Sequence, residues 1–138
     1  MPERLPISVF VIALNEADRI GRTLASVADW ADEVIVIDSG STDGTCDIAR
    51  AAGARVISHD WPGYGQQKIF GEQQCRNRWL LNLDADEVVS PALADSIRSF
   101  INGDTTGIGA AAFRWQMVHW RDPKPRRLAP SHRFVRPL

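Results

Sequence analysis

The chain has few cysteines and no long hydrophobic run, and both absences limit the classes of protein to which it can belong. Its 138 residues include only two cysteines, Cys46 and Cys75, which lie far apart. A disulfide framework or a zinc site needs more cysteines at closer spacing, so this pattern favours a reducing cytoplasm. The longest apolar run, residues 9–14, is much shorter than the roughly 20 residues of a membrane-spanning helix. The first residues also do not resemble a secretory signal.

Motifs of several nucleotide-binding and hydrolytic enzymes are missing as well. No G-x-G-x-x-G follows the first apolar run, and no G-x-x-x-x-G-K-[ST] occurs, which excludes a dinucleotide fingerprint and a P-loop. The absence of G-x-S-x-G disfavours an α/β-hydrolase. An apolar content of 44% with a charged content of 24% is typical of an ordinary globular protein, so disorder and coiled coils are disfavoured.

The net charge of −1 hides an unequal distribution of charge. Residues 113–138 have seven basic side chains against one acid, a net charge of +6, whereas residues 1–112 have nine basic and sixteen acidic side chains. The acidic body indicates a site for a cation. The basic, proline-punctuated tail indicates contact with phosphates or with an anionic membrane surface. A solvated extension with no partner is the alternative for the tail.

Strand and helix patterns alternate along the first hundred residues. Near-continuous apolar runs predict strands over 7–14, 33–38, 55–58 and 79–84, and a fifth over 110–118. Helical spacing and end signals predict helices after Asn15, which is a candidate N-cap, through Ile48 as far as Gly53, over 66–75, and from Ser90. This order predicts an α/β fold with a mainly parallel central sheet flanked by helices. Little regular structure is expected beyond Trp120.

Acidic residues follow three of the predicted strands. Because open α/β sheets bind ligands beyond the carboxyl ends of their strands, we expect these acids to lie together at the binding edge. Each acid alone could instead serve its local structure, as a helix cap or a solvated side chain. The acids are Glu16 after the first strand, Asp38 and Asp43 after the second, and Asp84, Asp86 and Glu87 after the fourth.

The sharpest of these signals is the pair Asp84 and Asp86, two residues apart at the end of a strand. Mg²⁺ and Mn²⁺ prefer carboxylate oxygens, and Mg²⁺ usually takes one or two protein carboxylates and fills its other positions with water and substrate phosphates. The pair therefore predicts a metal held between the protein and a diphosphate. Lys68 lies near the start of a predicted helix and could reach a phosphate, or it could be a plain surface lysine.

Four segments in order, ISVFVIALNEADRI, EVIVIDSGSTDGT, DWPGYGQQKIFG and WLLNLDADE, resemble family 2 glycosyltransferases. Within that family they look most like the branch associated with lipopolysaccharide core biosynthesis. The resemblance covers about residues 7–120 and implies a GT-A fold, a nucleotide-diphosphate-sugar donor, a divalent cation (Mn²⁺ or Mg²⁺) and sugar transfer with inversion. It also implies that residues 1–120 form the nucleotide-sugar-binding domain. Residues 121–138 would then begin an acceptor-binding half, so that the chain is C-terminally truncated.

The resemblance also implies roles for individual residues. Relatives often have a second acid where this chain has Ser39, and the catalytic base is not identified; His119 and Asp122, with His132, are weak late candidates. For the nucleoside, the implied roles are to line its pocket for Asn15 and Glu16 and to contact the nucleobase for Asp38, with Asp43 as a further acid of the Asp38 loop. For the diphosphate and metal, Lys68 lies near the diphosphate, Asp84 near the ribose and metal, Asp86 binds the metal directly and Glu87 supports the metal site.

The resemblance predicts a glycosyltransferase that acts on a cell-envelope glycan, with the lipopolysaccharide core as the expected acceptor. The expected partners are the sugar donor and a glycolipid or oligosaccharide acceptor, without nucleic acid. The expected location is the cytoplasm, with peripheral contact at the inner face of the cell membrane. Two alternatives stay open: an inactive fragment that binds nucleotide and metal, and a Mg²⁺-dependent phosphatase. Phosphatases of that kind usually place their aspartates after the first strand, where this chain has Asn15 and Glu16.

Overall fold

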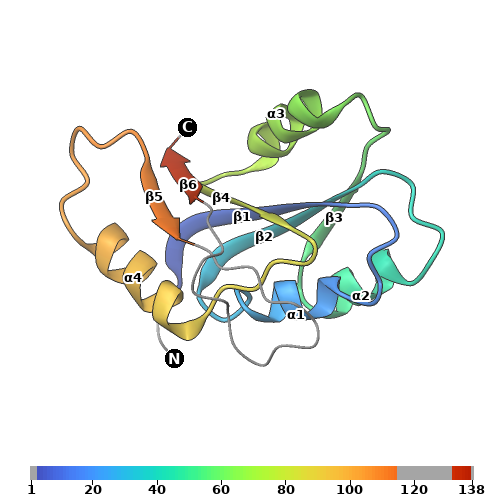
Figure 1. The fold of residues 1–138 in the computed structure, drawn as a ribbon, viewed down its shortest axis with the longest axis horizontal. Helices are drawn as coiled ribbons and strands as arrows, with labels where there is room; N and C mark the ends of the chain where they lie inside the picture. The colour runs from blue at the N-terminus through green and yellow to red at the C-terminus, as the bar shows by residue number, and fades with distance from the viewer. Residues whose placement is uncertain (1–2, 115–131, 138) are drawn as a thin grey trace.

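A computed structural model describes residues 3–114 and 132–137 and shows a single twisted sheet with helices on both faces (Figure 1). The strands are β1 (Leu5–Ala13), β2 (Ala31–Asp38), β3 (Arg55–Ser58), β4 (Trp79–Asp84), β5 (Ala111–Arg114) and β6 (His132–Pro137). The helices are α1 (Ile20–Ala25), α2 (Thr45–Ala51), α3 (Tyr64–Gln74) and α4 (Pro91–Asn102).

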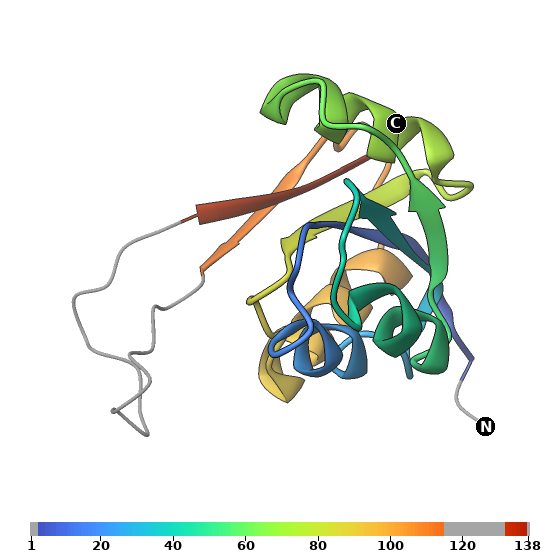
Figure 2. The same ribbon diagram turned by 90° about the vertical axis from the view of Figure 1, so that its right-hand side faces the viewer.

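The strand order is β3-β2-β1-β4-β6-β5, and the first four strands of the chain run parallel to one another. Their last residues are aligned, because Ala13 pairs with Asp38 and Asp38 pairs with Ser58. On the other side of β1, Ile12 pairs with Asp84. The loops after all four strands therefore leave from one side of the sheet, called here the carboxyl edge, which faces the viewer in Figure 2.

Two layers of side chains cover the sheet, and alternation along β1 divides them. Val9 and Val11 are fully buried in the larger cluster, whereas Phe10, between them, belongs to the smaller one. Helices α1, α2 and α4 lie on the larger cluster's side, and α3 covers the other face (Figure 1). The backbone of α3 comes so close to the sheet that a Cβ on Gly71 would be 2.5 Å from Phe10 Cδ2, so this position requires glycine.

The structure confirms the predicted α/β sheet and several predicted element ends, whereas β1 and α3 differ from their predicted bounds at both ends and β5 begins at Ala111 rather than at 110. Ser90 is the N-cap of α4, and its Oγ accepts a hydrogen bond from the Leu93 N–H at 3.1 Å. Gly53 follows α2 with a φ of 87°, a conformation that favours glycine. The third and fourth strands, Arg55–Ser58 and Trp79–Asp84, begin and end at the predicted residues.

Two predictions about the region between β1 and β2 are wrong. Asn15 caps no helix, since α1 begins only at Ile20 with Arg19 in the cap position. The apolar residues at helical spacing after Asn15 (Ala17, Ile20, Leu24, Val27 and Ala31) predict a helix that reaches Ala31, but Ala31 instead begins β2 and pairs with Leu5. The Leu5 N–H donates to the Trp30 carbonyl at 2.8 Å, and this contact between segments distant in sequence extends the strand.

The C-terminal region also differs from the prediction. β5 ends at Arg114, and the remaining residues of the predicted strand, 115–118, lie outside the described residues. The expectation of little regular structure beyond Trp120 is wrong for residues 132–137, which form β6 between β4 and β5, antiparallel to both. This strand depends on partners far away in the sequence, which local patterns do not reveal. Within the described residues, no helix has the length and apolarity needed to cross a bilayer.

Candidate functional site

Asp38, the last residue of β2, organises the loop that follows it. Its carboxylate accepts hydrogen bonds from the N–H groups of Gly40 (3.0 Å) and Ser41 (2.9 Å) and from the Ser41 hydroxyl (2.5 Å). Burial would raise the pKa of Asp38, but these hydrogen bonds, with one from the Cys46 thiol, outweigh it and lower the pKa below 3.8. Asp38 is therefore an ionised side chain, 2% exposed, that shapes the carboxyl edge.

Asn15 joins the loop after β1 to the loop after β2. Its backbone adopts a left-handed conformation with a φ of 53°, which asparagine tolerates better than most residues. In this conformation the Asn15 N–H donates to Ser41 Oγ at 2.8 Å, and Asn15 Oδ1 accepts from the Thr42 N–H at 2.8 Å. Asn15 therefore lies at the carboxyl edge, where it links two loops rather than beginning a helix.

Glu16 and Asp43 lie in the same junction. Asp43 Oδ1 accepts from the N–H and the hydroxyl of Thr45, and its Oδ2 accepts from the Ala17 N–H at 3.2 Å. The Thr45 hydroxyl also accepts from the Glu16 N–H at 2.9 Å. Hydrogen bonds from Thr45 lower the pKa of Asp43, against a smaller opposing effect of desolvation. The Glu16 carboxylate pairs with the Arg19 side chain at 2.6 Å, so Asp43, but not Glu16, holds the backbone of these loops through its carboxylate.

The loop after β4 carries the predicted metal ligands and forms a tight turn. The Glu87 carboxylate accepts from the Asp84 N–H at 2.9 Å, and the Glu87 N–H donates to the Asp84 carbonyl at 3.0 Å. Glu87 therefore closes the turn that carries the other two acids. Asp84 and Asp86 are exposed on either side of Ala85, which is buried.

Thr23 of α1 and Ser26, the C-cap residue of that helix, position this turn, and neither was predicted as a site residue. The Thr23 hydroxyl donates to the carbonyl of Ala85 at 2.9 Å, with both groups buried. Ser26 Oγ accepts from the Val89 N–H at 3.0 Å. The available signal was the position of Thr23, a polar residue on the otherwise apolar face formed by Ile20, Leu24 and Val27.

The acids at the end of β4 fit one particular way of binding a divalent cation. Among residues 3–114, no three side chains of the His, Cys, Asp or Glu type come close enough to form a protein-only metal site. Mg²⁺ usually binds through one or two carboxylates together with substrate phosphates, and Mn²⁺ shares its preference for oxygen ligands. Asp84 and Asp86, exposed on one turn, match that donor set and would complete it only with a bound diphosphate.

A buried network connects α3 to the carboxyl edge. Gln67, fully buried, donates from Nε2 to Ser39 Oγ at 3.0 Å and to the His59 carbonyl at 3.3 Å. Its Oε1 lies 2.6 Å from His59 Nδ1, and the imidazole stacks on Phe70 with ring centroids 3.7 Å apart. Lys68, the next residue, is half-buried on the same helix. Lys68 is a predicted site residue, whereas Gln67 could not be predicted because a lone glutamine carries no motif.

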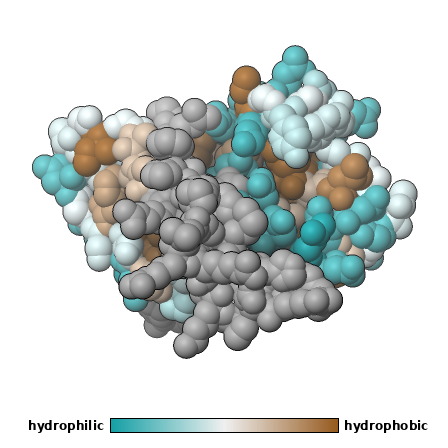
Figure 3. Space-filling model, in the orientation of Figure 1, coloured by the Kyte–Doolittle hydropathy of each residue, from teal (hydrophilic) through white to brown (hydrophobic). Residues whose placement is uncertain are grey.

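The structure thus brings most of the predicted site residues to one edge of the sheet. On the face shown in Figure 3, hydrophilic side chains gather over the right-hand edge, where these loops lie, and hydrophobic patches interrupt them beneath α3. The late candidates for a base, His119 and Asp122, lie outside the described residues, and only the backbone of His132 is described, in β6. At this edge hydrogen bonds join the loops after β1 and β2, and Asp84 and Asp86 are exposed on the turn after β4.

Known proteins share this chain's sequence and fold. The family model described as "Glycosyl transferase family 2" matches residues 8–137. An uncharacterized glycosyltransferase of Rickettsia felis is 45% identical over 131 residues, which are 94% of this chain and 46% of that protein. The lipopolysaccharide core biosynthesis glycosyltransferase LpsC of Rhizobium meliloti is 36% identical over 114 residues, 79% of this chain and 42% of that protein. The chain therefore spans about half the length of these curated relatives.

Two solved structures also superimpose on most of this chain. Glucosyl-3-phosphoglycerate synthase from Mycobacterium tuberculosis was solved in complex with Mn²⁺, uridine diphosphate and glucosyl-3-phosphoglycerate. It superimposes with a TM-score of 0.62 at 30% identity, over 77% of this chain and 42% of that one. A structure of TarS from Staphylococcus aureus, residues 1–349, gives a TM-score of 0.62 at 25% identity, over 70% of this chain.

Proposed function

The chain belongs to glycosyl transferase family 2 and has the GT-A fold, and we propose that it binds the nucleotide-diphosphate-sugar donor of an inverting glycosyltransferase. The observation that carries this proposal is the convergence of the loops after β1, β2 and β4 at one edge, with Asp84 and Asp86 exposed there. We assign donor binding to residues 1–120, and residues 121–138 to the beginning of the acceptor-binding part.

Each loop has a separate task in this proposal. Asn15, Glu16, Asp38 and Asp43 shape the nucleoside pocket through the hydrogen bonds that join the first two loops. The turn of Asp84 and Asp86 holds the divalent cation. Lys68, on α3, places its positive charge toward the diphosphate.

The proposed chemistry rests on charge at the leaving group. When a sugar leaves a nucleotide diphosphate, negative charge increases on the diphosphate oxygen, and groups already in position to meet that charge lower the barrier. A divalent cation held by Asp84 and Asp86 would act as a Lewis acid and stabilise this charge. The chain's own contribution is orientation, because Glu87 and Thr23 fix the turn that carries the acids before any ligand binds.

The acceptor that we propose is a cell-envelope glycan, and specifically the lipopolysaccharide core. The similarity to LpsC supports this choice, although the neighbour glucosyl-3-phosphoglycerate synthase has a name that implies a different acceptor. The basic residues of the tail would suit a phosphorylated glycolipid at the inner face of the membrane. The proposed location is therefore cytoplasmic, with peripheral membrane contact.

Titration calorimetry with uridine, guanosine and adenosine diphosphates tests donor binding. We expect at least one of the three to bind with Mn²⁺ or Mg²⁺ and to lose its affinity in excess chelator, because the acids of this edge would otherwise repel a diphosphate. Asp86→Asn should weaken binding by more than about 100-fold, since removal of a residue that merely supports a metal ligand already costs 10- to 100-fold. Asp95→Asn, on the exposed face of α4, is the matched control.

Equal affinity with and without chelator would contradict the metal role, and an equal effect of Asp86→Asn and Asp95→Asn would contradict the assignment of the site. Transfer itself is tested by incubating the chain with nucleotide-sugars, Mn²⁺ and a deacylated core oligosaccharide. A mass increase of one sugar identifies the donor. Transfer to 3-phosphoglycerate in place of the oligosaccharide would overturn the proposed acceptor.

A further inference from the structure

Two aromatic side chains are exposed at the junction between β3 and α3. The side chains of Trp61 and Tyr64 are 48% and 71% exposed, and their rings meet edge to face with centroids 4.9 Å apart. Burying such rings contributes strongly to stability, so an exposed pair commonly marks a surface that contacts a ligand or a partner. Neither ring belongs to the two buried clusters on the faces of the sheet.

The segment that carries this aromatic pair is held at both ends. His59, before it, and Gln67, after it, are joined by the hydrogen bonds of the buried network, and the Gln67 N–H also donates to the Gly63 carbonyl at 2.9 Å. Gly63, which lies between Trp61 and Tyr64 in the sequence, has a φ of 119°, a value that a residue with a Cβ rarely adopts. The rings are therefore presented on a fixed turn, which lowers the entropy lost when a ligand binds.

The ends of β3, β2, β1 and β4 form a row along the carboxyl edge, with the aromatic pair at its β3 end and the candidate metal ligands at its β4 end. Asp84, Ala13, Asp38 and Ser58 end adjacent strands, so β3 ends about 14 Å from β4 at a strand spacing of 4.7–4.9 Å. A nucleoside diphosphate has its base and its diphosphate on opposite sides of the ribose. With the diphosphate at the end of β4, a base directed along the row passes the loops of Asn15 and Asp38 and reaches the β3 side.

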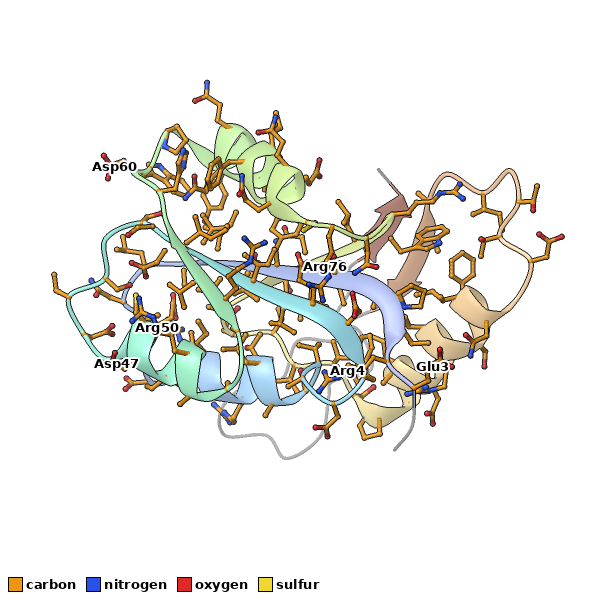
Figure 4. The ribbon with its side chains drawn as sticks, turned by 180° about the vertical axis from the view of Figure 1, so that it is seen from behind. Glu3, Arg4, Asp47, Arg50, Asp60 and Arg76 are labelled. Atoms are coloured by element: carbon orange, nitrogen blue, oxygen red, sulfur yellow. The ribbon has the colours of Figure 1, made fainter. Side chains whose placement is uncertain are left out.

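We propose that Trp61 and Tyr64 form a stacking platform for the nucleobase of the donor. This proposal rests on the proposed function and adds a contact from the β3–α3 turn. Aromatic side chains stack on any base through its flat face, so this contact does not depend on which base the donor carries. Lys68 supports the assignment, because it lies one helical turn after Tyr64 and so on the same side of α3, where it can reach the phosphate side of a base-bound nucleotide. Asp60, which precedes the pair, points away from the body of the molecule (Figure 4).

The test compares a ligand that has a base with one that lacks it. Trp61→Ala and Tyr64→Ala are titrated with uridine diphosphate and with inorganic pyrophosphate, both with Mn²⁺. We expect each variant to lower the affinity for uridine diphosphate about 5- to 150-fold, the range that corresponds to loss of one stacking contact. The affinity for pyrophosphate should not change. Ile69→Ala, at an exposed apolar position of the same helix, is the matched control and should change neither. Trp61→Phe and Tyr64→Phe should retain most of the affinity because they keep a ring.

Other outcomes overturn the platform in distinguishable ways. If the variants lose affinity for both ligands equally, or lose no affinity for uridine diphosphate, the aromatic pair does not bind the base. If the parent protein binds pyrophosphate with Mn²⁺ but uridine diphosphate no more tightly, the platform fails and the metal–diphosphate part of the proposed function stands. If the parent binds neither pyrophosphate nor any of the uridine, guanosine and adenosine diphosphates, both proposals fail. Loss of core-oligosaccharide binding in Trp61→Ala, with nucleotide affinity unchanged, would assign the rings to the acceptor.

Discussion

The two ends of the parallel strands both gather acidic side chains, but they use them differently. At the amino end, Arg76 Nε lies 3.0 Å from Asp32 Oδ2 and 3.2 Å from Glu33 Oε2, and Asn77 Nδ2 donates to Asp32 at 2.9 Å. At the carboxyl edge, Asp38 and Asp43 bind hydroxyl and backbone N–H groups of their own loops. Arg76 and Arg4 lie toward the amino end of the strands and Asp60 toward the other (Figure 4).

The difference indicates which end is built for stability and which for binding. Arginine neutralises the acids of the amino end and closes that end of the sheet around the buried Glu33. Burial raises the pKa of Cys75, which lies nearby, to about 12, and the charge of Glu33 adds to this, so the thiol stays protonated. At the carboxyl edge Glu16 also pairs with an arginine, Arg19, but Asp38 and Asp43 shape their loops through hydrogen bonds to hydroxyl and N–H groups instead. Asp84 and Asp86 are exposed on the turn after β4, which leaves this edge suited to a cation.

Thr23→Val should have the largest effect, because it acts on both stability and binding. The valine has a similar shape but no hydroxyl, so the buried carbonyl of Ala85 loses its donor and the free energy of unfolding should fall by about 1–3 kcal/mol. The turn of Asp84 and Asp86 should also lose its fixed position. We expect weaker Mn²⁺-dependent nucleotide binding, measured by calorimetry at a temperature where the variant is folded. Unchanged binding would show that this tether serves stability alone.

Ser8→Ala should reduce stability by a similar amount without affecting binding. Ser8 Oγ is fully buried at the amino end and accepts from the Asn77 N–H and from Asn77 Nδ2, both at 3.1 Å. Both donors lose an acceptor in the variant, so urea unfolding should show a loss of about 1–3 kcal/mol. Ser96→Ala, on the exposed side of α4, should change stability by less than about 0.5 kcal/mol. A change in nucleotide affinity in Ser8→Ala would contradict the assignment of stability to the amino end and of binding to the carboxyl edge.

Acid should destabilise the carboxyl edge through Asp38. Because the folded-state pKa of Asp38 lies below its ordinary value of 3.8, its ionised form contributes stability that is fully present above that value. This contribution is lost as the pH falls through 3.8 and toward the folded-state pKa. Asp38→Asn should therefore be less stable than the parent at pH 7 and lose less stability between pH 5 and pH 3. Urea unfolding across this range is the measurement, and parallel curves for the two proteins would contradict the role of Asp38.

Arg76→Gln should have the smallest effect, because the Arg76 side chain is 63% exposed, solvent screens its pair with Asp32, and Arg55 still lies 3.7 Å from the buried Glu33. The melting temperature should fall slightly at low salt, and the difference from the parent should shrink in 1 M NaCl. Nucleotide affinity should stay at the parent value. A difference that persists undiminished in 1 M NaCl would indicate that Arg76 acts by packing rather than by charge.

Several elements could be predicted from the sequence because their signals are local. The apolar runs of β1 and β4, the cap at Ser90 and the glycine after α2 each depend on neighbouring residues. β6 could not be predicted, because its strand exists through pairing with β4 and β5. The same holds for Asn15, whose position after a strand suggests a helix cap, whereas the contacts with Ser41 and Thr42 that hold it come from another loop.

The candidate site divides in a similar way. The acids at strand ends are visible in the sequence, since parallel strands place their carboxyl ends together. Thr23, Ser26 and Gln67 carry no motif, and their roles follow only from the groups that they meet in the fold.

The sequence by itself determined the family of this protein, its parallel sheet and the acids at the carboxyl edge, because these depend on motif order and on the period of apolar residues. Only the tertiary structure decided which acids organise backbone, which pair with arginine, and where the aromatic pair lies relative to the end of β4. Those outcomes depend on strand order and on hydrogen bonds between distant segments. A strand or helix pattern records which face of its own segment is buried, but not which segment will cover it.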